Sequence, residues 1–239
     1  WTFVEAENPL LDAFYRLNRA DTLEKGRAAA ERIHAPGLNL VWANAGGDIA
    51  WWAAAKLPMR PTGVNPAFIL DGSSEAADKL GFHPFSANPK EENPARGYIV
   101  SANFQPLPAS GIEIPGYYNP PERGQRLNQR LAAPDVRWDI HNSQALQLET
   151  ATAYGPKLLA PIIGELRAAA ADEQERELVE ALAAWQGDHP LQSLPATLFN
   201  QLTYELGRAT LEPRLGAQAF EQLLSTRMID SALPRLTAD

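Results

Sequence analysis

Two apolar runs separated by a short polar segment form the clearest pattern in the chain. The first run is Leu38–Ala43, and the second begins at Ile49 and ends with the tryptophan pair Trp51–Trp52. Asn, Gly and Asp fill the gap between the runs, and Gly46–Gly47 can adopt the positive φ that a tight turn requires. The pattern therefore predicts an antiparallel β-hairpin.

A third apolar run begins at Gly97 and predicts another strand, which would present the side chain of Asn103 near its end. Before this run, residues 61–96 carry five prolines, which interrupt every potential helix. A loop of this length either wraps the core as packed surface, anchored by phenylalanines, or contributes to a functional cleft. Both interpretations stay open from the sequence.

Helical periodicity and capping residues mark most of the remaining chain. Residues 10–18 are amphipathic, and the segment from Asp21 to Glu24 has the form of a capping box that begins a helix reaching about residue 33. The later predicted helices are residues 123–131, 136–152, 158–171 and 172–185, with a break at 154–156 and two or three more helices between 195 and 233. Each has an apolar face.

These elements predict an α+β fold with few antiparallel strands and a mainly helical C-terminal half. We expect residues 1–239 to form a single fragment, with a strand-containing part in residues 1–131 and a helical lobe in residues 132–239. At 239 residues the chain is long enough to bury a substantial core.

Composition and charge exclude several classes of function. The chain has 29 acidic and 21 basic residues, so nucleic acid is not an expected partner, because nucleic-acid binding depends on clustered Lys and Arg. No long uncharged apolar run predicts a membrane span. Cysteine is absent, which excludes disulfides and thiolate nucleophiles. The four histidines lie far apart without metal-ligand spacing, so no zinc site is predicted.

Five short motifs resemble the β-subunit of the penicillin acylase family, which includes acyl-homoserine-lactone acylases. They occur in the family's order and near its spacing: Gly47–Trp52, Leu57–Arg60, Gly81–Phe85, Asn93–Pro94 and Gly97–Ile99. The resemblance implies that the chain is a central to C-terminal piece of that subunit. It further implies that the strands belong to the αββα core of an N-terminal-nucleophile hydrolase.

The resemblance assigns roles to two residues. Asn103 matches the family's oxyanion-hole asparagine, whose amide N–H donates to the negative charge that gathers on a reacting carbonyl oxygen. Arg123, at the start of a helix after a Pro-rich stretch, matches an arginine that organises the family's active site, although the alignment there needs a short gap. From the residues alone, Asn103 could instead cap a strand end and Arg123 could be an exposed helix-start residue.

The resemblance also indicates what this chain lacks. The family's nucleophile is a Ser at the first position of the β-subunit, whereas position 1 here is Trp1, so we expect the chain to be an excised or processed piece. The missing partners would be the α-subunit and the N-terminal part of the β-subunit. Some family members hold calcium, but the matching position is Gly111, with Glu113 nearby, so neither calcium nor a cofactor is predicted.

Together these implications predict an amide hydrolase that removes an acyl group from an amine head group, such as a β-lactam nucleus or a homoserine lactone. An N-terminal Ser would form the acyl-enzyme, and this piece alone would be inactive. The resemblance implies a periplasmic or secreted location. The alternative is a non-catalytic helical module that binds or assembles on an acylase-like scaffold.

Overall fold

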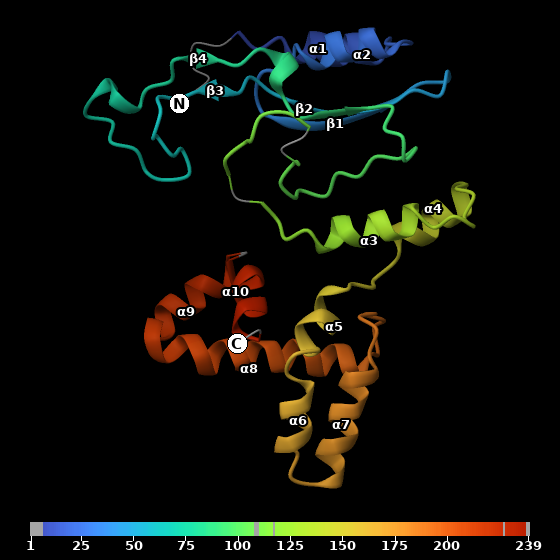
Figure 1. Ribbon diagram of the computed structural model, residues 1–239, viewed down its shortest axis with the longest axis vertical. Helices are drawn as coiled ribbons and strands as arrows, with labels where there is room; N and C mark the ends of the chain where they lie inside the picture. The colour runs from blue at the N-terminus through green and yellow to red at the C-terminus, as the bar shows by residue number, and fades with distance from the viewer. Residues whose placement is uncertain (1–6, 108–109, 117, 227, 238–239) are drawn as a thin grey trace. The chain divides into compact units, whose positions relative to one another are not determined.

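The computed structural model describes residues 7–107, 110–116, 118–226 and 228–237. The chain divides into two compact units, Trp1–Asn119 and Pro120–Asp239. Among the described residues, the first unit holds the strands together with two α-helices, and the second is built from α-helices (Figure 1). The predicted α+β class is confirmed.

The first unit is organised on a three-stranded antiparallel sheet in the order β1-β2-β5. The strands are β1 (Leu38–Ala43), β2 (Ile49–Ala54) and β5 (Lys90–Glu92), while β3 (Pro58–Met59) and β4 (Gly81–Phe82) form a separate two-stranded sheet. The predicted hairpin is confirmed, since β1 and β2 pair in register along all six residues of each strand.

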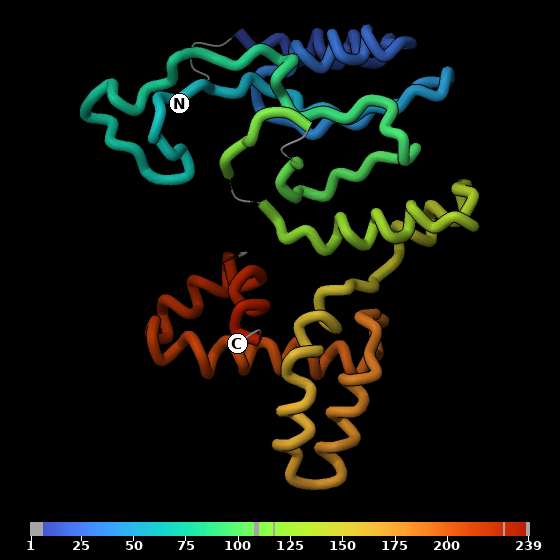
Figure 2. The backbone as a smooth tube through the Cα atoms, viewed as in Figure 1, coloured from blue at the N-terminus to red at the C-terminus, as the bar shows by residue number. Residues whose placement is uncertain are grey.

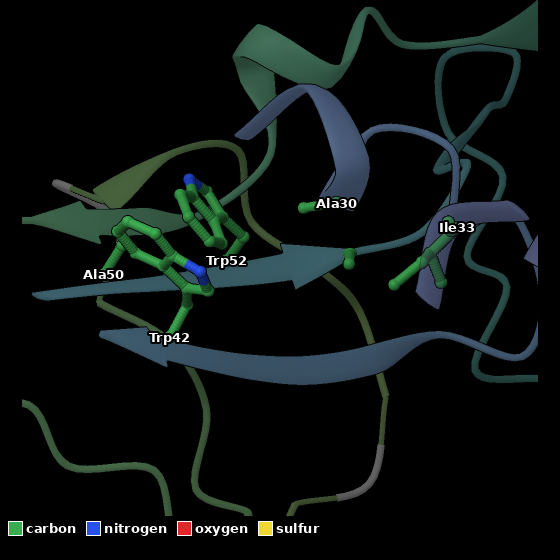
Figure 3. Close-up of a cluster of buried hydrophobic side chains, with 7 residues drawn as sticks. Ala30, Ile33, Trp42, Ala50 and Trp52 are labelled. Atoms are coloured by element: carbon green, nitrogen blue, oxygen red, sulfur yellow. The ribbon is translucent and has the colours of Figure 1, made fainter. Parts of the chain in front are cut away.

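One face of this sheet carries the core of the first unit. In the β1–β2 register Leu40 lies opposite Trp52, and Trp42 lies opposite Ala50, so these side chains share a face. Figure 3 shows the two indoles close together, and their ring centroids lie 6.1 Å apart. Burial of these large apolar groups is the main source of stability for the unit.

Two helices, α1 (Leu10–Leu17) and α2 (Leu23–Ala30), cover that face (Figure 1). The side chain of Thr22 accepts a hydrogen bond from the backbone N–H of Lys25 at 3.3 Å and begins α2, so the N-cap is Thr22 and the predicted four-residue capping box from Asp21 is wrong. Asp21 instead forms an ion pair with Lys25 at 2.6 Å. The helix is shorter than predicted and ends at Ala30.

The strand predicted from Gly97 to Asn103 is wrong, because none of these residues lies in a described strand. The third strand of the sheet is β5, which lies in the segment that we predicted to be irregular. Two short 3₁₀ helices, Glu75–Ala77 and Phe85–Ala87, also lie in that segment. After β5 the chain runs back along the face of the sheet opposite α1 and α2 (Figure 2).

The second unit confirms the predicted helical region, although several helices have other bounds than predicted. Its helices are α3 (Glu122–Leu131), α4 (Ile140–Gln147), α5 (Tyr154–Leu159), α6 (Ile163–Ala169), α7 (Glu173–Ala184), α8 (Leu194–Leu215), α9 (Ala217–Leu224) and α10 (Met228–Leu236). The predicted break at residues 154–156 is wrong, because Pro156 lies in the first turn of α5, where a missing N–H costs nothing. None of the described helices is both long and apolar enough to cross a lipid bilayer.

The core of the second unit gathers around Trp185. Its ring packs against Phe199 with centroids 5.0 Å apart, and its indole N–H donates to the carbonyl of Asp188 at 2.7 Å. Gly155 approaches the ring so closely that a Cβ there would lie 2.4 Å from it. The hydroxyl of Tyr154 donates to the carbonyl of Asp230, and burial raises the pKa of Tyr154 to about 12. The phenol therefore stays neutral and structural.

Candidate functional site

A pocket of roughly 300 Å³ lies on the sheet face opposite the two helices of the first unit. The end of β2 and the segment after β5 line it together. The lining is mostly apolar: Gly37, Leu38, Ala53, Ala54, Ala55, Leu57, Phe104, Pro106 and Ile114, with the polar residues Asn39, Asn103 and Tyr118. An apolar pocket with a few polar groups at its margin is typical of small-molecule sites.

Asn103 lines this pocket from a bend rather than from a strand end. Its φ is +60°, in the left-handed region that asparagine adopts more readily than other non-glycine residues, and Asn93 also has a positive φ. Its backbone carbonyl accepts a hydrogen bond from the N–H of Asn119 at 2.9 Å, which fixes the bend. Residues held in such conformations concentrate at functional sites, because the surrounding structure must hold them there.

Tyr118, next to that backbone bond, is the main pocket residue to which we assigned no role from the sequence. It is half-buried, and its hydroxyl donates to the carbonyl of Ile114 at 2.7 Å. Burial, assisted by the charge of Glu113, raises the pKa of Tyr118, so its hydroxyl is not a proton acceptor near neutral pH. A sequence feature could have drawn attention to Tyr118, because Tyr118 and Asn119 lie in the Gly- and Tyr-containing stretch before Arg123.

Two of the resembling motifs meet in the structure and have a structural role. Asn93 donates its amide to Asp48 at 2.9 Å, and its Oδ1 accepts the backbone N–H of Ile49 at 2.9 Å. Asn44 donates to the other oxygen of Asp48 at 2.8 Å. These bonds, with that from Asn93 the largest cause, hold the pKa of Asp48 below its usual value. The two motifs therefore connect the turn between β1 and β2 to the residue that follows β5 by hydrogen bonds.

Arg123 is the second residue of α3 and is exposed. It belongs to the second unit, whereas Asn103 belongs to the first. One turn along α3, Arg126 pairs with Glu149, which also lies 3.6 Å from Arg130. Glu149 is therefore shared as a counter-ion by Arg126 and Arg130.

Gly111, the position that the resemblance assigns to the family's calcium ligand, offers no carboxylate to a metal ion. Gly111 has no side chain, and a Cβ there would lie 2.4 Å from the backbone nitrogen of Pro89. The carboxylate of Glu113 accepts from the amide of Gln105 at 3.2 Å. Within the described residues, no group of three or more His, Cys, Asp or Glu side chains is arranged to hold a metal ion.

Comparison with known proteins gives a consistent family assignment. The penicillin amidase family model matches residues 1–238. The acyl-homoserine lactone acylase QuiP of Pseudomonas syringae pv. tomato is 27% identical over 222 residues, which cover 87% of this chain and 26% of that protein. Penicillin G acylase of Escherichia coli is 30% identical over 158 residues, covering 63% of this chain and 18% of that protein.

A solved structure shares the fold. Thermostable penicillin G acylase from Alcaligenes faecalis aligns with a TM-score of 0.75 and 20% sequence identity, covering 92% of this chain and 41% of that one. The chain thus spans about a quarter of the length of the curated relative with which it aligns over 222 residues.

Proposed function

Because the chain belongs to the penicillin amidase family, we propose that it forms part of an amide hydrolase that transfers an acyl group from an amine head group to water. The observation that supports this function is Asn103, held at φ +60° at the margin of an apolar pocket. The head group would be a β-lactam nucleus or a homoserine lactone, the classes acted on by the related acylases.

In the proposed reaction, a serine hydroxyl supplied from outside this chain attacks the carbonyl carbon of the substrate amide. The oxygen of that carbonyl becomes an oxyanion, to which the Nδ2 of Asn103 donates a hydrogen bond. Collapse of the intermediate breaks the C–N bond, and the amine leaves with the proton that the serine hydroxyl gave up when it attacked. Water then hydrolyses the acyl-serine ester and releases the carboxylic acid.

The pocket beside Asn103 would take the acyl group. Ala53, Leu57 and Ile114 offer an apolar surface, which favours a hydrocarbon chain over a charged group. In this scheme Arg123 takes part in the active-site hydrogen-bond network, because a guanidinium offers five donors in a fixed geometry. The complete protein would act in the periplasm or outside the cell, with the α-subunit as partner.

Asn103→Ala in the complete protein tests this function. We expect kcat for hydrolysis of an acyl-homoserine lactone to fall by about 10²–10³-fold, because one oxyanion donor is removed. KM should change little, since the donor acts on the charge that develops in the transition state. Steady-state kinetics with circular dichroism as a folding check measures both.

Gln105→Ala is the matched control, because Gln105 is exposed in the same segment and does not line the pocket. It should retain the wild-type kcat. A folded Asn103→Ala variant with unchanged kcat would contradict the proposed role and would favour the alternative, a non-catalytic module on an acylase-like scaffold.

A further inference from the structure

The C-terminal end of β2 is held by a side chain where a backbone partner would normally lie. In the β2–β5 register Trp52 lies opposite Lys90, so the next residues, Ala53 and Pro89, face each other. The N–H of Ala53 donates to the carbonyl of Pro89 at 2.9 Å. The return bond of that pair is impossible, because proline has no N–H.

The amide of Asn88 replaces the missing donor. Its Nδ2 donates to the carbonyl of Ala53 at 2.9 Å and to the carbonyl of Ala55 at 2.8 Å. One side chain therefore satisfies two carbonyls, one at the end of β2 and one just after it. Asn88 itself is 2% exposed, and its Oδ1 is buried with no hydrogen-bond partner among the described residues. Its two donated bonds therefore determine how the amide is oriented.

The backbone on either side of Asn88 also contacts a second segment, the one that contains Gly111 and Ile112. The carbonyl of Ala87, the residue before Asn88, accepts the N–H of Ile112 at 2.9 Å, so a backbone bond joins the segment before β5 to the segment after it. Gly111 packs directly on the Asn88–Pro89 backbone, where a Cβ would lie 2.4 to 2.6 Å from backbone atoms. Glycine is required at this close approach.

Both joined segments form walls of the pocket. Ala53 and Ala55, whose carbonyls bind Asn88, line one side, and Ile114, two residues after Ile112, lines another. Asn88 therefore connects the two walls without itself lining the pocket. Loss of the amide would leave the buried carbonyl of Ala53 without its side-chain donor and would let the strand end move.

We propose that Asn88 is a positioning residue that sets the separation of the two pocket walls and thereby the length of acyl chain that the pocket accepts. The inference rests on the proposed function only in naming the acyl chain as the ligand. No family motif that we identified in the sequence includes this residue.

The test is Asn88→Ala in the complete protein, with binding of a homologous series of straight-chain carboxylic acids measured by calorimetry. The wild type should discriminate between successive acids near its optimum by roughly fourfold per methylene. In the variant we expect the optimum to move toward longer acids by at least one methylene. KM values for acyl-homoserine lactones of different chain length should shift in the same direction, with kcat less affected.

Asn93→Ala is the matched control, because the side chain of Asn93 binds the β2 backbone at the opposite end of the β2–β5 ladder, as an acceptor, and does not line the pocket. It should lower stability and leave the chain-length profile unchanged. If Asn88→Ala does not fold, Gly111→Ala tests the same claim, since its Cβ would force the Ile112 segment away from Asn88.

An unchanged chain-length profile in the folded Asn88→Ala or Gly111→Ala variant would overturn the inference, as would an equal shift in Asn93→Ala. The binding result for Asn88→Ala can be distinguished from the kinetic test of the proposed function, because binding of a carboxylic acid requires no catalysis. If Asn103→Ala keeps its kcat while Asn88→Ala shifts the profile, the proposed function fails and the positioning role stands.

Discussion

Three asparagines in the first unit have the same side chain in different structural roles. Asn88 donates to two strand carbonyls, and Asn93 accepts a strand N–H, so these two end the β2–β5 ladder on either side of β5. Asn103 is different, since it lies at the pocket margin in a left-handed bend. A short amide side chain that can imitate a backbone donor or acceptor suits all three positions.

Glu92 on β5 binds one residue of α2 and one residue of β2, and it gives a pH prediction. Its carboxylate accepts hydrogen bonds from Nε and from a terminal nitrogen of Arg27, each at 2.7 Å. It also accepts a hydrogen bond from the indole N–H of Trp52 at 2.7 Å. The hydrogen bond from Arg27 is the largest cause that lowers the pKa of Glu92 below its usual value of 4.5. The folded state therefore binds this proton less readily than the unfolded state does.

A carboxyl whose pKa is depressed on folding stabilises the protein above its unfolded pKa, and that contribution is lost as the pH falls below about 4.5. We expect Glu92→Gln to destabilise the first unit by about 1–3 kcal/mol at pH 7, because a charged acceptor is lost. The difference from the wild type should shrink as the pH falls through this range. Urea unfolding at several pH values measures it, and a difference that does not change with pH would contradict the argument.

At the scale of secondary structure, the local signals in the sequence were sufficient for the hairpin and for most helices. Gly46–Gly47 specified a turn and periodicity specified the apolar faces, as the β1–β2 pairing and α7 illustrate. β5 was missed because Lys90–Glu92 has no apolar alternation, and its place depends on pairing with β2. The two Asn-Pro dipeptides that flank it were the available signal.

The predicted strand before Asn103 failed for the opposite reason. Tyr98–Val100 is apolar enough for a strand, but no described strand pairs with it, and a strand is defined by its partner. Asn103 could be singled out from its motif, whereas the pocket it lines depends on contacts between distant segments such as Ala53 and Ile114. No pattern within either segment encodes that contact.

Packing of α5 in the second unit gives a further prediction. Gly155→Ala adds a methyl group whose carbon would lie 2.4 Å from the ring of Trp185, a side chain that is 5% exposed and hydrogen-bonded. We expect the substitution to lower the free energy of unfolding by about 1–3 kcal/mol through overpacking. Thermal or urea unfolding followed by tryptophan fluorescence measures the change.

Gly164→Ala is the control within a neighbouring helix, because nothing lies within 4 Å of a Cβ at Gly164. It should be neutral or stabilising, by up to about 1 kcal/mol, since alanine favours helix over glycine. Equal destabilisation by both substitutions would contradict the packing argument.

At the scale of the whole molecule, the described core residues fall into two separate clusters. One lies around Trp42 and Trp52 in the first unit, and the other lies around Trp185 and Phe199 in the second. The pocket and Asn103 belong entirely to the first unit. The chain covers about a quarter of its acyl-homoserine lactone acylase relative, so the proposed chemistry is a property of the complete protein.

The central claim is that the amide of Asn103 donates to the oxyanion of the reacting carbonyl. The most direct measurement compares how tightly an alkyl boronic acid and the matching carboxylic acid inhibit the complete protein and its Asn103→Ala variant. Only the boronic acid forms a tetrahedral, anionic adduct with a serine hydroxyl. We predict that the variant binds the boronic acid about 10²-fold more weakly and the carboxylic acid within about twofold of the wild type. Equal loss of affinity for both inhibitors, or no loss for either, would contradict the claim.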